Sequence, residues 1–259
     1  MAPLGRLEIE VAEKRYPARD ASGPRSVLED LRLGVSRGEF LCILGPSGCG
    51  KTTLLNLIAG LDRDFEGRVG WQGAASAPRI GYVFQEPRLL PWLTVMQNVE
   101  LVLGERGAEE GEAGAADPAF LEHLLEVAGL AEFRDAYPQR LSLGLARRAA
   151  LVRAFAVKPD LLLMDEPFVS LDRPTAERLR RLLVGIWSER PTTVIFVTHS
   201  LGEALQLADR IVQLSASPAS VVADLQVPLP RAARGDRAAM ARLRDELLRD
   251  RPLLGGEAE

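Results

Sequence analysis

One glycine-rich octapeptide constrains this chain more than any other stretch of its sequence. Residues 45–52 read Gly-Pro-Ser-Gly-Cys-Gly-Lys-Thr and follow the apolar run Phe40–Leu44, which is typical of a buried strand. Leu54, Leu55 and Ile58 then recur at helical spacing. The sequence therefore predicts a strand, a glycine loop and a helix in that order. The pattern G-x-x-x-x-G-K-[ST] is the phosphate-binding P-loop.

The residue types of this loop match the chemistry of a polyphosphate. Three glycines let the backbone turn tightly, so that successive N–H groups surround an anion at the start of a helix. Lys51 then reaches the β- and γ-phosphates, and the Thr52 hydroxyl can ligate Mg²⁺. An ordinary glycine-rich turn is the alternative, and the flanking strand and helix argue against it. We predict nucleotide binding by Gly45, Pro46, Ser47, Gly48, Cys49, Gly50, Lys51 and Thr52.

Composition excludes several other classes of protein. The 259 residues carry a net charge of −4, so no basic surface for nucleic acid is indicated. No apolar run approaches the roughly 18 residues of a membrane helix, and the first residues lack the apolar core of a signal peptide. Cys42 and Cys49 lie too close together to indicate a structural disulfide, which fits a reducing cytosol. We expect any membrane association to run through a partner protein.

A second candidate site lies at the end of another apolar run. Leu161–Met164 precedes Asp165 and Glu166, and ligands bind at the carboxyl ends of strands in open α/β sheets. Asp165 is suited to hold Mg²⁺ through water, and Glu166 to polarise an attacking water. A strand that merely ends in solvated acids is the alternative. The P-loop earlier in the chain favours the catalytic interpretation.

Further motifs follow in a fixed order. Gln85 ends a strand candidate, Ile80–Phe84, and Leu141-Ser142-Leu143-Gly144 opens a helix. Ser170-Leu171-Asp172 follows the two acids. A buried strand, Thr193–Val197, leads into Thr198-His199, and a histidine at a strand end can hydrogen-bond a γ-phosphate.

In this combination the chain, from about Leu7 to Leu225, resembles the ATP-binding cassette family, specifically the ATPase subunit of a bacterial transporter. The resemblance implies that Tyr16 stacks on adenine and that Thr53 lies near the α-phosphate. It also implies that Gln85 contacts Mg²⁺ and the attacking water. The implied catalytic set is Glu166, His199, Lys51 and Gln85, and the implied metal ligands are Thr52, Gln85 and Asp165.

The same resemblance implies a dimer in the ATP-bound state. Ser142 and Gly144 match the signature loop, which in this family closes on the γ-phosphate bound by the opposite protomer. Asp172 matches the residue that joins the two halves. Two equivalent composite sites, with ATP and Mg²⁺ as ligands, are then expected.

The expected fold is an α/β P-loop NTPase (RecA-like) core with an N-terminal antiparallel β subdomain and an inserted α-helical subdomain. Alternating buried strands and helices predict the parallel sheet, and the helix-rich block predicts the insertion. The ATPase domain is expected over 1–225, with its core at about 1–86 and 159–225 and the helical subdomain at about 87–158. The tail, 226–259, is expected to carry an amphipathic helix near 237–249.

The signature departs from the usual L-S-G-G-Q. Leu143 replaces the first glycine and Leu145 the glutamine. A leucine loses the freedom of positive φ and adds bulk where two protomers would meet. We therefore expect slower but retained ATP hydrolysis. Ser200 also stands where the family commonly has an aspartate after the histidine.

Residues 85–92 and the tail segment 227–231 resemble importers of nitrate, taurine, aliphatic sulfonates and related small solutes. The resemblance implies a membrane permease as partner, a periplasmic or extracellular solute-binding protein indirectly, and a peripheral place on the cytoplasmic face of the inner membrane. Leu89, Leu90, Pro91 and Trp92 either line the groove for the permease or form lobe core. An exporter or lipid-trafficking ATPase is an alternative. A soluble cassette ATPase acting on nucleic acid typically has two cassettes or a long coiled coil, which this chain lacks.

Overall fold

The computed structural model describes residues 5–17, 23–73, 77–103 and 117–251. Its contacts divide the chain into two compact units. The first combines Met1–Ala77 with Thr193–Glu259, and the second is Pro78–Thr192.

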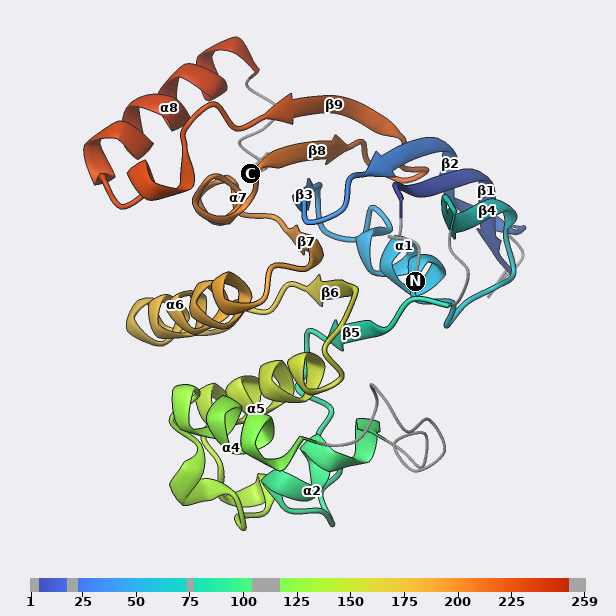
Figure 1. The fold of residues 1–259 in the computed structure, drawn as a ribbon. Helices are drawn as coiled ribbons and strands as arrows, with labels where there is room; N and C mark the ends of the chain where they lie inside the picture. The colour runs from blue at the N-terminus through green and yellow to red at the C-terminus, as the bar shows by residue number, and fades with distance from the viewer. Residues whose placement is uncertain (1–4, 18–22, 74–76, 104–116, 252–259) are drawn as a thin grey trace. The chain divides into compact units, whose positions relative to one another are not determined.

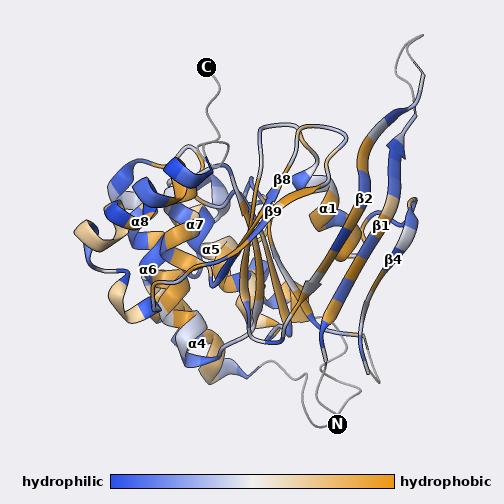
Figure 2. Ribbon diagram, turned by 90° about the horizontal axis from the view of Figure 1, so that it is seen from above, coloured by the Kyte–Doolittle hydropathy of each residue, from blue (hydrophilic) through white to orange (hydrophobic). Residues whose placement is uncertain are grey.

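An antiparallel sheet in the first unit has the strand order β2-β1-β4 (Figure 1). These strands span Leu7–Tyr16 (β1), Arg25–Val35 (β2) and Glu66–Trp71 (β4). In β1, Leu7, Ile9 and Val11 are buried, because alternate residues of a strand face the same side. Figure 2 shows hydrophobic and hydrophilic residues mixed along β1 and β2. The predicted N-terminal antiparallel β subdomain is confirmed.

The remaining strands of the first unit are built around β3 (Phe40–Leu44), which pairs in parallel with β7 (Thr193–Thr198) and with β8 (Arg210–Leu214). All residues of β3 and β7 are buried, as expected for strands covered on both faces. At the edge, β9 (Val221–Gln226) runs antiparallel to β8. Along β9 half-buried and exposed residues alternate, as expected for a strand at the edge of a sheet.

The described part of the first unit contains the helices α1 (Lys51–Ile58), α7 (Leu201–Leu207) and α8 (Arg237–Asp250), with a short 3₁₀ turn at Arg231–Ala233. The predicted amphipathic tail helix is α8, which contacts α7. Its apolar stripe is half-buried: Met240, Leu243, Leu247 and Leu248.

In the second unit, the strands β5 (Ile80–Val83) and β6 (Leu161–Asp165) pair in parallel. Among the described residues of this unit, the α-helices are α2 (Val95–Glu100), α4 (Pro118–Val127), α5 (Leu143–Ala156) and α6 (Arg173–Glu189). Short 3₁₀ turns lie at Leu101–Leu103, Ala131–Phe133 and Pro138–Arg140. Asp117 caps α4 by accepting a hydrogen bond from the Phe120 N–H, and Pro118 is the first helical residue.

The helix at the centre of this unit is α5, which contacts α2, α4, α6 and β5. Nine of its fourteen residues are buried, so it has no solvent-facing stripe. The compact unit is therefore wider than the predicted helical subdomain, 87–158, because β5, β6 and α6 pack with the helices. The boundaries of the helical subdomain at about 87 and 158 stay a prediction.

Parallel buried strands joined through helices, together with the N-terminal antiparallel sheet, confirm the α/β fold class. Within the described part of the chain, no helix is both long enough and apolar enough to cross a membrane.

Candidate functional site

The glycine loop lies between β3 and α1, as predicted. Gly48 and Gly50 have φ values of +74° and +113°, a region that side chains rarely tolerate. A Cβ atom on Gly50 would also lie 2.8 Å from Val27 Cγ1. Glycine is thus required at Gly50 by both backbone conformation and close packing.

Lys51, the first residue of α1, lies over this loop. Its side chain is buried, and its Nζ donates hydrogen bonds to the carbonyls of Gly45 at 2.9 Å and Pro46 at 3.0 Å. A phosphate arriving in the loop offers this ammonium stronger, charged acceptors than the two carbonyls. Thr52, the next residue, is exposed.

Tyr16, the predicted adenine-stacking residue, lies beside the same helix. Its hydroxyl is 3.5 Å from Thr53 Oγ1 and 3.3 Å from Asp62 Oδ2, and its side chain is 39% exposed. The Lys14 ammonium lies 4.7 Å from the ring centre. An exposed aromatic face next to α1 suits a base whose phosphates lie in the adjoining loop.

His199 is placed at the same sheet edge as the P-loop. The parallel register pairs Leu44 of β3 with Thr198 of β7, so Gly45 and His199 leave neighbouring strands at the same level. His199 is exposed. The residue after it, Ser200, caps α7 by accepting from the Glu203 N–H at 3.4 Å. Serine at this position therefore starts the helix that follows the histidine.

The second unit places the other strand-end residues together. Val83 of β5 pairs with Met164 of β6, so Gln85 and the Asp165–Glu166 pair follow strands that end at the same level. Asp165 is buried and Gln85 is exposed. Burial, and secondly the charge of Asp165, raise the pKa of Tyr82 far above its ordinary value. Glu166 has a φ of +42°, which is uncommon for a side chain other than glycine.

The signature segment starts α5. Ser142 caps this helix, and its Oγ accepts from the Leu145 N–H at 3.3 Å. Gly144 lies against α6, because a Cβ there would come within 2.8 Å of Thr175 Cγ2. Asp172 caps α6 by accepting from the backbone N–H of Thr175 at 2.9 Å and from its hydroxyl at 3.1 Å. These bonds lower the pKa of the Asp172 carboxyl.

Each unit thus gathers part of the predicted site. The first unit holds Tyr16, the loop Gly45–Thr52, Thr53 and His199; the second holds Gln85, Ser142, Gly144, Asp165, Glu166 and Asp172.

Sequence reasoning missed several buried polar residues of the second unit, among them Asn98, Arg147 and Arg153. Asn98 donates to the carbonyls of Leu90, Leu93 and Thr94, and so organises the loop that carries Trp92. Arg147 and Arg153 of α5 are also buried. The available signal for Arg153 was a single charged side chain within the otherwise apolar segment 149–156.

The predicted metal ligands have the right donor chemistry. Thr52, Gln85 and Asp165 offer hydroxyl, amide and carboxylate oxygens, the hard donors that Mg²⁺ prefers. Among the described residues, no group of three or more His, Cys, Asp or Glu side chains could hold a metal ion. Donors of these types fit an ion whose remaining coordination positions are filled by substrate phosphates and water.

A P-loop between a buried parallel strand and a helix, with an acidic pair ending another parallel strand, defines a P-loop ATPase. Comparison with known proteins identifies the branch. Residues 28–169 match the family described as ABC transporter. The chain belongs to this family and is an ATP-binding cassette ATPase.

Several relatives share most of its length. An aliphatic sulfonates import ATP-binding protein, SsuB 2, of Burkholderia cenocepacia is 44% identical over 87% of this chain and 79% of that protein. The SsuB 1 protein of Xanthomonas axonopodis pv. citri is 38% identical over 93% of this chain and 94% of that protein. The dimeric ATP-binding cassette MJ0796, in a post-hydrolysis state bound to ADP and Pi, superimposes with a TM-score of 0.71 at 31% identity, covering 86% of this chain and 100% of that one.

Proposed function

We propose that this chain powers the import of aliphatic sulfonates or related small anionic solutes through a separate membrane permease. The hydrolytic part rests on one observation above all: Lys51 lies folded over its own P-loop, beside the strand end that carries His199. The import part rests on the names of the relatives, which are sulfonate import proteins at up to 44% identity. No comparison supports an exporter or a nucleic-acid ATPase.

In this proposal each residue acts on ATP in a distinct way. Tyr16 stacks on adenine, and Lys51 with the loop N–H groups binds the β- and γ-phosphates. Glu166 polarises the attacking water, Gln85 orients it, and His199 hydrogen-bonds the γ-phosphate. When bound, Mg²⁺ neutralises charge on the β- and γ-phosphate oxygens, and Thr52, Asp165 and Gln85 are the residues that would hold it.

The signature residues serve a second copy of the chain. Ser142 and Gly144 present the N-terminus of α5 to the γ-phosphate held by the opposite protomer, and Asp172 contacts that protomer. Dimeric cassette structures among the relatives by fold support this arrangement.

The permease would dock on the segment Leu89–Trp92. Trp92 is 69% exposed, and Asn98 holds the surrounding loop by its backbone, so the apolar ring has a fixed place at the surface. This exposure disfavours the alternative that Trp92 is lobe core. A peripheral place on the cytoplasmic face of the inner membrane follows from that partner.

The test is ATPase turnover of the full chain with the permease that co-purifies with it, reconstituted in liposomes. A sulfonate-loaded binding protein should stimulate turnover, and the empty binding protein should not. Lys51→Ala should abolish both the basal and the stimulated rate. Stimulation by DNA instead of the loaded binding protein, or normal turnover by Lys51→Ala, would contradict the proposal.

A further inference from the structure

Two arginines of α5 lie where only apolar side chains are expected. Arg147 and Arg153 are 6% and 8% exposed, and burial lowers the pKa of both guanidinium groups. A buried charge is costly unless it is well hydrogen-bonded. The partners of these two side chains therefore indicate what offsets that cost.

Arg153 binds the segment that follows Gln85. Its Nη1 donates to the Arg88 carbonyl and its Nη2 to the Pro87 carbonyl, each at 2.8 Å. Arg88 has a φ of +46°, in the left-handed region that side chains usually avoid. The guanidinium thus holds a strained turn, and that turn begins immediately after Gln85.

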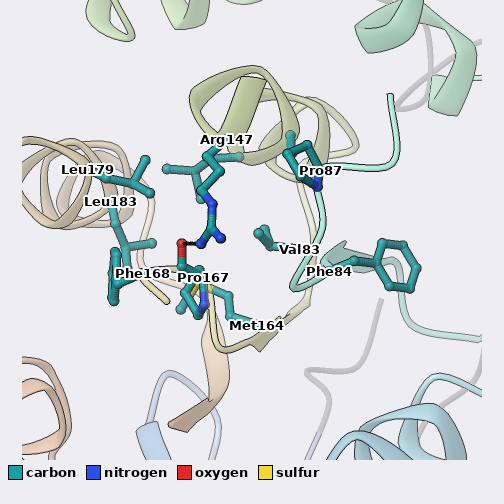
Figure 3. A pocket seen from close by; sticks show the side chains of 11 residues that line it. Val83, Phe84, Pro87, Arg147, Met164, Pro167, Phe168, Leu179 and Leu183 are labelled. Carbon is teal, nitrogen blue, oxygen red and sulfur yellow. Dashed lines mark hydrogen bonds between the residues drawn. The ribbon is translucent and has the colours of Figure 1, made fainter. Parts of the chain in front are cut away.

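Arg147 binds the segment that follows Glu166 in the same way. Its Nη1 donates to the Pro167 carbonyl, as Figure 3 shows, and Glu166 has a φ of +42°. A second bond, from the Val169 N–H to the Glu166 carbonyl at 3.2 Å, closes the turn. Strained backbone of this kind persists only where its surroundings hold it.

The surroundings of Arg147 argue against a purely stabilising role. The pocket it enters is lined by apolar side chains, among them Val83, Met164, Leu179 and Leu183 (Figure 3). Its Nε finds no hydrogen-bond partner among the described residues. An apolar side chain of similar length would fill this pocket without a desolvation cost, so stability alone would favour methionine over arginine.

We propose that Arg147 and Arg153 are positioning residues through which α5 holds the turns after Glu166 and Gln85. In this arrangement α5, which begins with Ser142 and Gly144, holds the two turns that follow β5 and β6 in its own unit. Movement of α5 would move the water-polarising carboxylate and the Gln85 turn with it. The inference rests on the proposed roles of Glu166 and Gln85 in ATP hydrolysis.

The central test is Arg147→Met in the full chain, with Arg147→Lys as the conservative variant. Arg147→Met should lower kcat about tenfold or more while KM for ATP stays within about twofold, because misplacing a catalytic group by an ångström can cost ~100-fold in rate. Its melting temperature should equal or exceed that of the wild type. Arg147→Lys, which keeps a donor for the Pro167 carbonyl, should recover most of kcat.

Arg148→Met is the matched control. Arg148 is the next residue of α5 and also donates to a backbone carbonyl, that of Ala128 at 3.3 Å, at the end of α4. Arg148→Met also removes a guanidinium from α5, but Arg148 does not bind the turn after Glu166 or the turn after Gln85. Its kcat should therefore stay within about twofold of the wild type. Hydrogen exchange of the Val169 amide should accelerate in Arg147→Met and not in Arg148→Met.

A double-variant cycle between Arg147 and Glu166 distinguishes a positioning role of Arg147 from a general loss of structure. In a Glu166→Asp background, which keeps a displaced carboxylate and a reduced turnover, Arg147→Met should lower kcat by a smaller factor than in the wild type, because both changes impair one function. Wild-type kcat in Arg147→Met, an equal loss in Arg148→Met, or an additive loss in the double variant would overturn the inference. Normal hydrolysis by Glu166→Gln itself would instead overturn the proposed function. Arg153→Met tests the turn after Gln85 in the same way. In a Gln85→Ala background it should lower kcat by a smaller factor than in the wild type.

Discussion

Single residues decide how far this cassette departs from its family. Leu143 and Leu145 replace a glycine and a glutamine of the signature, yet Ser142 still caps α5 through the Leu145 N–H. The start of the helix is therefore intact, and its N–H groups remain available to an anion. Leu143 is 46% exposed, so its bulk lies at the surface that a second protomer would meet.

This geometry gives the first prediction. In the double variant Leu143→Gly/Leu145→Gln, ATP turnover should rise or stay unchanged, because a bulky apolar group leaves the surface beside the anion-binding N–H groups. Steady-state phosphate release is the measurement, with Leu151→Met in the body of α5 as a control for nonspecific effects. A collapse of turnover would mean that the leucines themselves form part of the site.

At the scale of elements, the contact between α5 and α6 depends on the absence of a side chain. A Cβ on Gly144 would lie 2.8 Å from Thr175 Cγ2, and Thr175 also binds Asp172 by its N–H and hydroxyl. The signature helix and the cap of α6 therefore meet at one threonine methyl group.

Gly144→Ala should destabilise the fold by about 1–3 kcal/mol, the usual cost of overpacking. Thr175→Ser removes the methyl group and keeps the hydroxyl that donates to Asp172. The double variant should therefore recover most of the lost stability. Urea unfolding of the two single variants and the double variant measures this, and strictly additive losses would contradict the contact.

A charged cluster joins elements of the first unit. Arg210 at the start of β8 donates to Asp224 of β9 at 2.6 Å, and also to the carbonyl of Gly34 in β2 at 2.9 Å. The Arg210 hydrogen bond holds the pKa of Asp224 below its ordinary value of 3.8.

A carboxyl with a lowered folded-state pKa stabilises the fold above its unfolded pKa, and this contribution is lost as pH falls through the folded value. Asp224→Asn should therefore lower the free energy of unfolding at pH 7. The difference from the wild type should shrink as the pH drops below 3.8. The measurement is thermal unfolding of the wild type and Asp224→Asn from pH 7 to below pH 3.8. A stability difference that does not change with pH would refute the lowered pKa of Asp224.

At the scale of the whole molecule, the proposed site requires two copies of the chain. Each protomer would supply Ser142 and Gly144 to the nucleotide of the other, so trapped ATP should hold a dimer together. The solved relatives include dimeric cassettes.

Glu166→Gln, which removes the carboxylate proposed to polarise water, should abolish turnover and yield a stable dimer in ATP. ADP should leave it monomeric. Size-exclusion chromatography with light scattering measures the mass, and adding Lys51→Ala should prevent the dimer because the phosphates are no longer held. A Glu166→Gln protein that hydrolyses ATP at near wild-type speed would show that Glu166 is not the base.

Much of the site was readable from local sequence. The P-loop, the apolar runs that become β3, β6 and β7, and the helix start at Ser142 involve residues close together in the chain, so spacing and side-chain chemistry were sufficient to identify them. The strands predicted over 80–84 and 161–164 correspond to β5 and β6, which pair in parallel and end at one level. Membership of the ABC transporter family was likewise predictable and is confirmed by the comparisons.

Tertiary structure alone decided which distant groups meet. The sequence contained no signal that Arg147 binds the Pro167 carbonyl, that Arg153 binds the turn after Gln85, or that Thr175 requires a glycine at Gly144. Those contacts join residues far apart in the chain, and their partners are backbone carbonyls or a methyl group, which every sequence contains. Local residues therefore determined which chemistry could be predicted for this protein, whereas packing around α5 determined how the backbone that follows Gln85 and Glu166 is held.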